Sequence, residues 1–184
     1  MLSDRFFTSV DRLVYRAIPD SPGNDPLDPS FAALSATNRW NRLGEATLYL
    51  ASDPRVLATE WARHVADEIK DATVAGQQKP RRIFEIRANI DLVADLRDLV
   101  LASELALRNH PYCCVESRTV CQQTATYLRK QTNARALIAP AIGLIDQPER
   151  WVLAVFTDKL PSYPEPFLMD IRSNGLLPKW FEWT

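Results

Sequence analysis

Residues 38–60 read NRWNRLGEATLYLASDPRVLATE and contain a loop, a strand and the start of a helix in close succession. The segment 46–51 has the apolar and aromatic content of a strand. Ser52-Asp53-Pro54 then indicates a helix start, because a side-chain oxygen can cap free backbone amides and proline is tolerated in the first turn. This order predicts that polar side chains from three different elements meet in one cleft.

Three residues of this stretch suit an anionic nucleotide whose bond breaks toward positive charge. Tyr49 follows Arg39 by ten residues, and Glu60 follows Tyr49 by eleven. An arginine forms bidentate bonds to phosphate, and a fixed carboxylate stabilises developing positive charge. Taken singly, two of these residues also have a structural interpretation: Tyr49 packs in its strand, and Glu60 is a solvated residue near a helix N-terminus.

Length and composition limit the classes of protein to which this chain can belong. The 184 residues predict a single domain, 1–184, with a core of its own. The net charge of −1 gives no general attraction to nucleic acid or anionic membrane. No apolar run reaches the roughly 18 residues of a membrane span, and the N-terminus has no secretory pattern, so we expect a cytoplasmic protein. Three cysteines and two histidines fit neither a disulfide framework nor a metal site.

The hydrophobic pattern predicts the remaining elements. Strands are expected over 13–18, 46–51, 82–90, 136–140, 151–156 and 167–171. Helices are expected from Pro54 to about Thr73 with an apolar stripe through Leu57, Trp61, Val65 and Ile69, from Asp91 to about Leu107, and over 117–130. Strands interrupted by helices in this way indicate a mixed α+β fold.

Several of these residues together resemble the motifs of the RES domain family. The resemblance runs from about Arg12 to Leu160 and rests on Tyr15-Arg16, Arg39-Trp40-Asn41-x-x-Gly44, Thr47-Leu48-Tyr49 and Ala58-Thr59-Glu60, with Gln122 or Gln123 at the start of the third helix. That family consists largely of bacterial toxins paired with Xre-type antitoxins. The resemblance therefore implies an Xre-type antitoxin as partner, and it leaves a homodimer open.

The resemblance also implies a fold and a reaction. The fold would be similar to ADP-ribosyltransferases, with a split β-sheet flanked by helices that binds NAD between the sheet halves. Family members cleave the nicotinamide–ribose bond of NAD and pass ADP-ribose to phosphate, water or a protein. The implied activity is that of an NAD phosphorylase or glycohydrolase with NAD as substrate and no metal. A mono-ADP-ribosyltransferase acting on a specific protein is the alternative.

The same resemblance implies roles for individual residues. Glu60, Tyr49 and Arg39 would be catalytic, with Glu60 at the reacting ribose and Tyr49 beside the nicotinamide, where its hydroxyl could also donate a hydrogen bond. The residues implied to bind NAD are Arg16, Arg39, Trp40, Asn41, Tyr49 and Ala141. Among these, Arg16 and Arg39 would lie at the pyrophosphate and ribose.

The chain departs from the family pattern at two places. Thr37 and Asn38 stand where the family has glycines, and Ala141 stands where it has a serine. One lost hydrogen bond costs about 1–3 kcal/mol, or roughly one to two decades in rate. Thr157, Ser117 or a water could replace that hydroxyl, or the chain could be a weakened or inactive module that binds NAD or an antitoxin. The aromatic tail Trp180-Phe181-Glu182-Trp183 either covers the protein's own core or contacts a partner.

Overall fold

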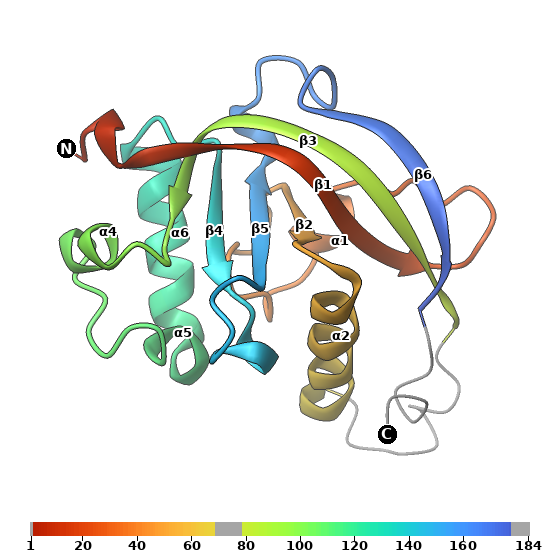
Figure 1. Cartoon of the computed structure of the whole chain (residues 1–184), viewed down its shortest axis with the longest axis horizontal. Coiled ribbons are helices and arrows are strands. Elements are labelled where there is room, and N and C mark those ends of the chain that lie inside the picture. Colours follow the sequence, from red (N-terminus) through yellow and green to blue (C-terminus); the bar gives the residue numbers. More distant parts are fainter. Residues whose placement is uncertain (1, 69–78, 178–184) are drawn as a thin grey trace.

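The computed structural model, which describes residues 2–68 and 79–177, is built around one six-stranded sheet (Figure 1). The strand order is β1-β2-β5-β4-β3-β6, and an additional pairing of β1 with β3 makes the sheet close on itself. The strands are β1 (Phe7–Pro19), β2 (Thr47–Ala51), β3 (Arg81–Asp95), β4 (Ala136–Pro140), β5 (Trp151–Phe156) and β6 (Leu168–Leu176).

Helices cover this sheet and connect its strands. Within residues 2–68 and 79–177 the α-helices are α1 (Ser30–Ala33), α2 (Pro54–Glu68), α4 (Leu99–Glu104), α5 (Cys113–Glu116) and α6 (Arg118–Gln131). The same part of the chain also forms the short 3-10 helices η1 (Asp4–Phe6), η2 (Ile142–Leu144) and η3 (Thr157–Lys159). The expected α+β class is confirmed, and its strands are joined in one continuous sheet. No described helix has the length and apolar character needed to cross a membrane.

The long strands β1 and β3 form an antiparallel pair that bends across the whole molecule (Figure 1). Their register runs from Phe7 opposite Ala94 to Pro19 opposite Arg81. The last residues of β3 also pair in parallel with β4, while β6 pairs antiparallel with β3. Strand β3 therefore joins the bent outer pair to the central strands.

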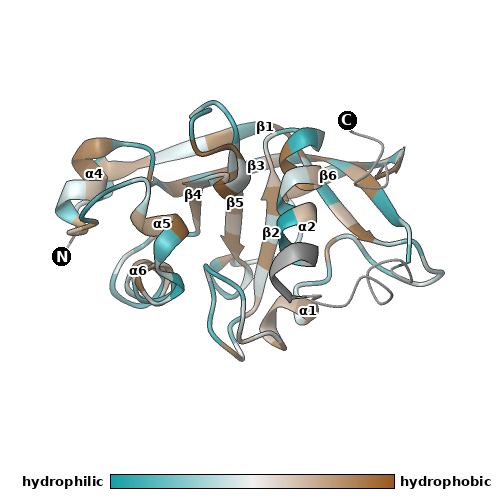
Figure 2. Cartoon of the chain, turned by 90° about the horizontal axis from the view of Figure 1, so that it is seen from below, coloured by the Kyte–Doolittle hydropathy of each residue, from teal (hydrophilic) through white to brown (hydrophobic). Residues whose placement is uncertain are grey.

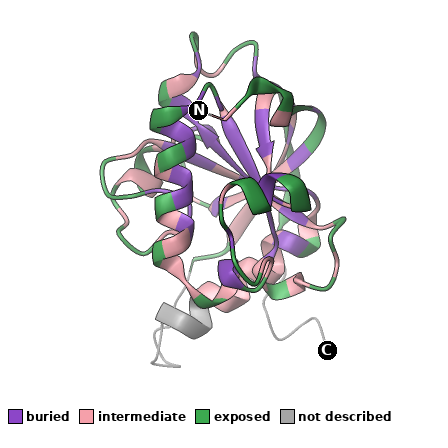
Figure 3. Cartoon of the chain, turned by 90° about the vertical axis from the view of Figure 1, so that its left-hand side faces the viewer, coloured by how far each residue is buried: buried purple, intermediate pink, exposed green. Residues whose placement is uncertain are grey.

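The central strands are largely hydrophobic, as Figure 2 shows, and buried, as Figure 3 shows. All five residues of β4 are buried, which agrees with its uninterrupted apolar sequence. Successive side chains alternate between two apolar clusters, so that Ile138 packs in one and Leu137 in the other. The second cluster includes Ala125 and Leu128 of α6, which fixes that helix against the sheet.

The predicted helix from Asp91 is wrong over its first eight residues. Strand β3 continues to Asp95, because Val93 and Ala94 are fully buried and Val93–Asp95 pair with β4. The helix begins only at Leu99, where the Asp98 side chain accepts a hydrogen bond from the amide of Val100. Tertiary burial therefore outweighed a local capping signal.

The other elements agree more closely with the sequence. Helix α6, expected over 117–130, begins after Ser117, whose side chain accepts a hydrogen bond from the amide of Val120 and so caps the helix. The strand expected over 13–18 starts earlier, at Phe7, and the strand expected over 167–171 continues to Leu176. The predicted end of α2 near Thr73, the stripe position Ile69 and the aromatic tail at 180–183 lie outside the described residues.

Candidate functional site

A cavity of about 280 Å³ lies where the loop before β2, helix α2 and the ends of β1 and β3 meet. The structure brings five of the seven implied site residues to its wall, namely Arg16, Arg39, Trp40, Tyr49 and Glu60. Asn41 and Ala141 do not line it. The loop, strand and helix of 38–60 thus deliver their polar side chains to one place.

The cavity is strongly cationic. Its wall contains five arginines, Arg16, Arg39, Arg63, Arg81 and Arg118, and Glu60 is the one carboxylate among its described lining residues. A concave site lined by one sign of charge concentrates ligands of the opposite sign. An anionic ligand is therefore the class that this cavity can bind.

Tyr49 presents its ring to the cavity, because its hydroxyl is already used within the protein. The hydroxyl accepts a hydrogen bond from the amide of Trp40 at 3.0 Å and donates one to Asn41 Oδ1 at 2.8 Å. Burial raises the pKa of the Tyr49 phenol, so it stays neutral. The ring face, and not a hydroxyl proton, is what Tyr49 can offer a ligand.

Asn41 fixes the loop that carries Arg39 without lining the cavity itself. It is fully buried, and its Nδ2 donates to the carbonyls of Ala32 at 2.9 Å and Arg42 at 3.0 Å. Its Oδ1 orients the Tyr49 hydroxyl. Asn41 acts on the cavity only through Tyr49 and the loop backbone.

The loop that carries Arg39 is also held by α6. Gln122 Nε2 lies 3.1 Å from the carbonyl oxygen of Ala36, 2.8 Å from that of Asn38 and 3.3 Å from that of Asn41. The neighbouring Gln123 is exposed, so Gln122 is the one of the two that supports the site.

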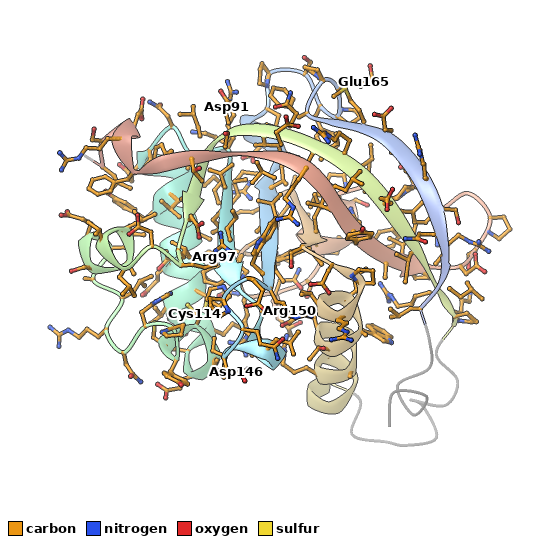
Figure 4. All side chains as sticks on the ribbon, viewed as in Figure 1. Asp91, Arg97, Cys114, Asp146, Arg150 and Glu165 are labelled. Atoms are coloured by element: carbon orange, nitrogen blue, oxygen red, sulfur yellow. The ribbon has the colours of Figure 1, made fainter. Side chains whose placement is uncertain are left out.

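Arg39 itself is anchored at one end of its guanidinium. Its Nη1 donates to the carbonyl of Cys114 on α5 at 3.1 Å, and Cys114 is labelled in Figure 4. Its Nε is buried and has no hydrogen-bond partner among the described residues. An unpaired buried N–H is costly, so a ligand oxygen would stabilise this side chain.

The carboxylate of Glu60 is held from both sides. Oε1 accepts hydrogen bonds from the amides of Ile142 at 2.7 Å and Gly143 at 3.3 Å, and Oε2 lies 3.1 Å from Nη2 of Arg63. A Cβ at Gly143 would lie only 2.1 Å from Cγ2 of Thr59. The missing side chain therefore lets η2 approach α2 closely enough for these bonds.

The position of the family serine, Ala141, is directly followed in sequence by the residue whose amide binds Glu60. Ala141 precedes Ile142, is fully buried and packs with Ala51 and Val56. The two residues that could replace the serine hydroxyl lie elsewhere. Thr157 Oγ1 donates to the carbonyl of Ala46, Ser117 caps α6, and neither lines the cavity.

Two arginines at the other side of the cavity carry buried charge. Arg16 is only 9% exposed; its Nη2 donates to the carbonyl of Asp28 at 2.9 Å, and its Nη1 has no partner among the described residues. Arg81 donates to the carbonyl of Ala17 at 3.0 Å and stacks 4.1 Å above the ring centroid of Trp61. Burial lowers the pKa of each of these guanidinium groups to about 10, because desolvation disfavours the charged form.

Sequence reasoning missed four charged or aromatic residues of the lining: Trp61, Arg63, Arg81 and Arg118. Trp61 was expected in an apolar stripe that packs on the core, yet it is half-buried and lines the cavity beside His64, whose ring lies 5.2 Å away. The spacing of Arg63 from Glu60, three residues along a helix, was the one available signal.

Comparisons with known proteins agree with this architecture. A family model described as RES domain matches residues 13–173. No curated protein sequence matches the chain. Among solved structures, a chain in the crystal structure of the M. tuberculosis MbcT-MbcA toxin-antitoxin complex is similar, with a TM-score of 0.69 and 19% identity over 92% of this chain and 87% of that one. This likeness shows the fold, and the family match spans most of the sequence, so the chain belongs to the RES domain family.

Proposed function

We propose that this chain is the toxin of a toxin–antitoxin system and that it consumes NAD. It breaks the nicotinamide–ribose bond and passes ADP-ribose to phosphate or water. The family match and the fold shared with a chain of a toxin-antitoxin complex support the toxin role, with an Xre-type antitoxin as partner. The observation that carries the chemistry is a single fixed carboxylate, Glu60, in a cavity lined by five arginines.

The residues present fit NAD as the substrate. The unpaired Nη1 of Arg16 and the adjacent Arg81 suit the diphosphate, which carries the negative charge of the dinucleotide. Arg39 lies on the loop next to Tyr49 and suits the ribose side. The cavity volume of about 280 Å³ lies just below the about 300–1,000 Å³ typical of ligand pockets, so the cavity encloses part of a dinucleotide and leaves the remainder outside.

The fixed position of Glu60 suits the bond that breaks. As the C–N bond lengthens, its electron pair moves to the nicotinamide ring, and positive charge develops on the ribose. A carboxylate already held by two backbone amides and Arg63 needs no reorganisation to stabilise that charge. The Tyr49 ring can pack on the nicotinamide ring while that ring is still cationic.

Free nicotinamide is the product that tests this function. The intact chain would be incubated with NAD, with and without inorganic phosphate and candidate acceptor proteins. We expect nicotinamide release from the wild type and its loss in Glu60→Gln, whereas the matched variant Glu104→Gln, on the exposed surface of α4, should behave as the wild type. Labelling of an acceptor protein would identify a transferase instead.

Ala141 favours one other candidate, a module that binds NAD or the antitoxin without turnover. It lacks the hydroxyl that the family pattern places beside the glutamate, and neither Thr157 nor Ser117 replaces it in the cavity. Wild-type protein that binds NAD but releases no nicotinamide under any of these conditions would contradict the enzymatic proposal and support this module.

A further inference from the structure

Arg150 lies outside the cavity, yet it contacts both elements that hold the carboxylate of Glu60. It directly precedes β5, and in Figure 4 it lies where the loop between η2 and β5 approaches the start of α2. Its side chain is 18% exposed, and its Nη1 lies 2.8 Å from Oδ1 of Asp53. Its carbonyl accepts a hydrogen bond from the amide of Ala141 at 3.3 Å. One residue therefore joins the start of α2 to the start of η2.

The side-chain contact fixes the N-terminus of α2. Oδ1 of Asp53 also accepts a hydrogen bond from the amide of Arg55 at 2.8 Å, so the carboxylate that caps the helix is the one that binds Arg150. The neighbouring Ser52 is bound to the residue after Arg150. Its amide donates to the carbonyl of Trp151 at 2.9 Å, and its Oγ accepts from the amide of Trp151 at 3.0 Å. The first turn of α2 is thus held against the start of β5.

The main-chain contact fixes η2. Ala141, whose amide donates to the carbonyl of Arg150, directly precedes this short helix. The amides of the next two residues, Ile142 and Gly143, are the ones that bind Oε1 of Glu60. A displacement of Arg150 would therefore move the donors of Glu60 as well as the helix that carries it.

The contact between α2 and η2 leaves little room for such a displacement. A Cβ at Gly143 would lie 2.1 Å from Cγ2 of Thr59, so the two elements touch. The amide of Ile142 lies 2.7 Å from Oε1 of Glu60, a short hydrogen bond, whereas that of Gly143 lies 3.3 Å away, at the long end of the range. A small separation of α2 from η2 would break the second bond and weaken the first.

We propose that Arg150 is a positioning residue for Glu60, because it holds α2 and η2 at the separation at which backbone amides fix the carboxylate. This inference rests on the proposed function and names a residue on which its reacting carboxylate depends. Neither Arg150 nor Asp53 lines the cavity, so neither contacts the nucleotide. Loss of the ion pair should leave substrate binding unchanged and slow bond cleavage, since a displaced carboxylate stabilises the developing positive charge less well.

Kinetics of nicotinamide release test the consequence for the reaction. We expect Arg150→Gln to lower kcat about tenfold and to change KM for NAD by no more than about twofold, the pattern of an interaction made only in the transition state. Arg150→Lys keeps the charge and one hydrogen bond to Asp53, so it should recover most of the lost kcat. The matched control Arg135→Gln removes a partly exposed ion pair with Asp91, which lies away from α2 and η2 in Figure 4, and it should behave as the wild type.

Hydrogen exchange of the unliganded protein tests the positioning itself, without NAD. Because the amides of Ile142 and Gly143 donate to Glu60, we expect Arg150→Gln to raise their exchange rates about tenfold. The amides of the buried strand β4, which leads into η2, should keep their wild-type rates. Arg135→Gln should leave both groups of amides unchanged.

An unchanged exchange rate at Ile142 in Arg150→Gln would overturn the proposal, whether or not the protein consumes NAD. An equal rise over all amides would also exclude it, because that result indicates a general loss of stability. A higher KM for NAD with an unchanged kcat would contradict positioning and make Arg150 a residue that acts on binding. If the wild type releases no nicotinamide, the proposed function is wrong, and hydrogen exchange still decides whether Arg150 positions Glu60.

Discussion

The two walls of the cavity are built in different ways. The wall formed by the Arg39 loop depends on neutral, buried hydrogen bonds from Asn41, Tyr49 and Gln122. The wall formed by α2 depends on charged contacts of partly exposed side chains, since Glu60 and Arg63 are 23% and 27% exposed. The first wall is part of the folded core, so its residues affect stability and function together. The second can lose its chemistry while the fold remains intact.

Glu60→Gln should separate function from stability most sharply. We expect nicotinamide release to fall by about 100- to 1,000-fold, because the fixed negative charge is lost. The glutamine carbonyl can still accept from the amides of Ile142 and Gly143, and a partly exposed ion pair contributes only about 0–1 kcal/mol. Urea denaturation should therefore show a change in unfolding free energy below about 1 kcal/mol. A loss of several kcal/mol would place Glu60 among the structural residues.

Asn41→Ala tests the opposite wall. We expect the free energy of unfolding to fall by about 2 kcal/mol, since this fully buried side chain satisfies two carbonyls and the Tyr49 hydroxyl. Nicotinamide release should decrease as well, through a displaced Arg39 loop. The midpoint of urea denaturation measures the effect, with Asn174→Ala at an exposed position of β6 as control. Equal midpoints for the two variants would contradict the distinction between the walls.

Gln122→Ala should have a smaller effect of the same kind. Its three carbonyl contacts hold the loop from α6, so we expect a loss of about 1–2 kcal/mol in stability and about tenfold in rate. Gln123→Ala removes the same groups from the adjacent exposed position and should change neither quantity. If both variants behaved alike, the loop would not depend on this contact.

Ala141→Ser should give the smallest change, and it is a gain. We expect nicotinamide release to rise about fivefold, which corresponds to about 1 kcal/mol of added transition-state stabilisation next to Glu60. The new hydroxyl enters an apolar cluster with Ala51 and Val56, so a slight loss of stability should accompany the gain. An unchanged rate would mean that another group already supplies this interaction.

The sequence predicted those elements whose whole hydrophobic or capping pattern lies within the element itself. Strand β4 is apolar throughout, and α6 has a capping serine at its start, so both were placed within a residue or two. The end of β3 could not be predicted, because its pairing with β4 depends on residues more than forty positions away. The four-residue helices α1 and α5 are too short to show a helical period.

The candidate site likewise contains residues that the local sequence predicts and residues that only the tertiary structure brings to it. Arg39, Tyr49 and Glu60 are close in sequence, and the order of loop, strand and helix was enough to bring them to one cavity. Arg81 and Arg118 reach it only through strand pairing and through the packing of α6, which no short motif encodes. The hydrogen bond that commits the Tyr49 hydroxyl to Asn41 is likewise visible only in three dimensions.

Gly143 and Thr59 are so close that a side chain at position 143 would overlap the side chain of Thr59. The obstructing atom is the Thr59 methyl group, while its hydroxyl donates to the carbonyl of Arg55 at 2.8 Å. A serine at 59 would keep that hydroxyl and remove the methyl, which makes room for a small side chain at 143. The tolerance of the site to change at one of these positions is therefore set by the size of the residue at the other.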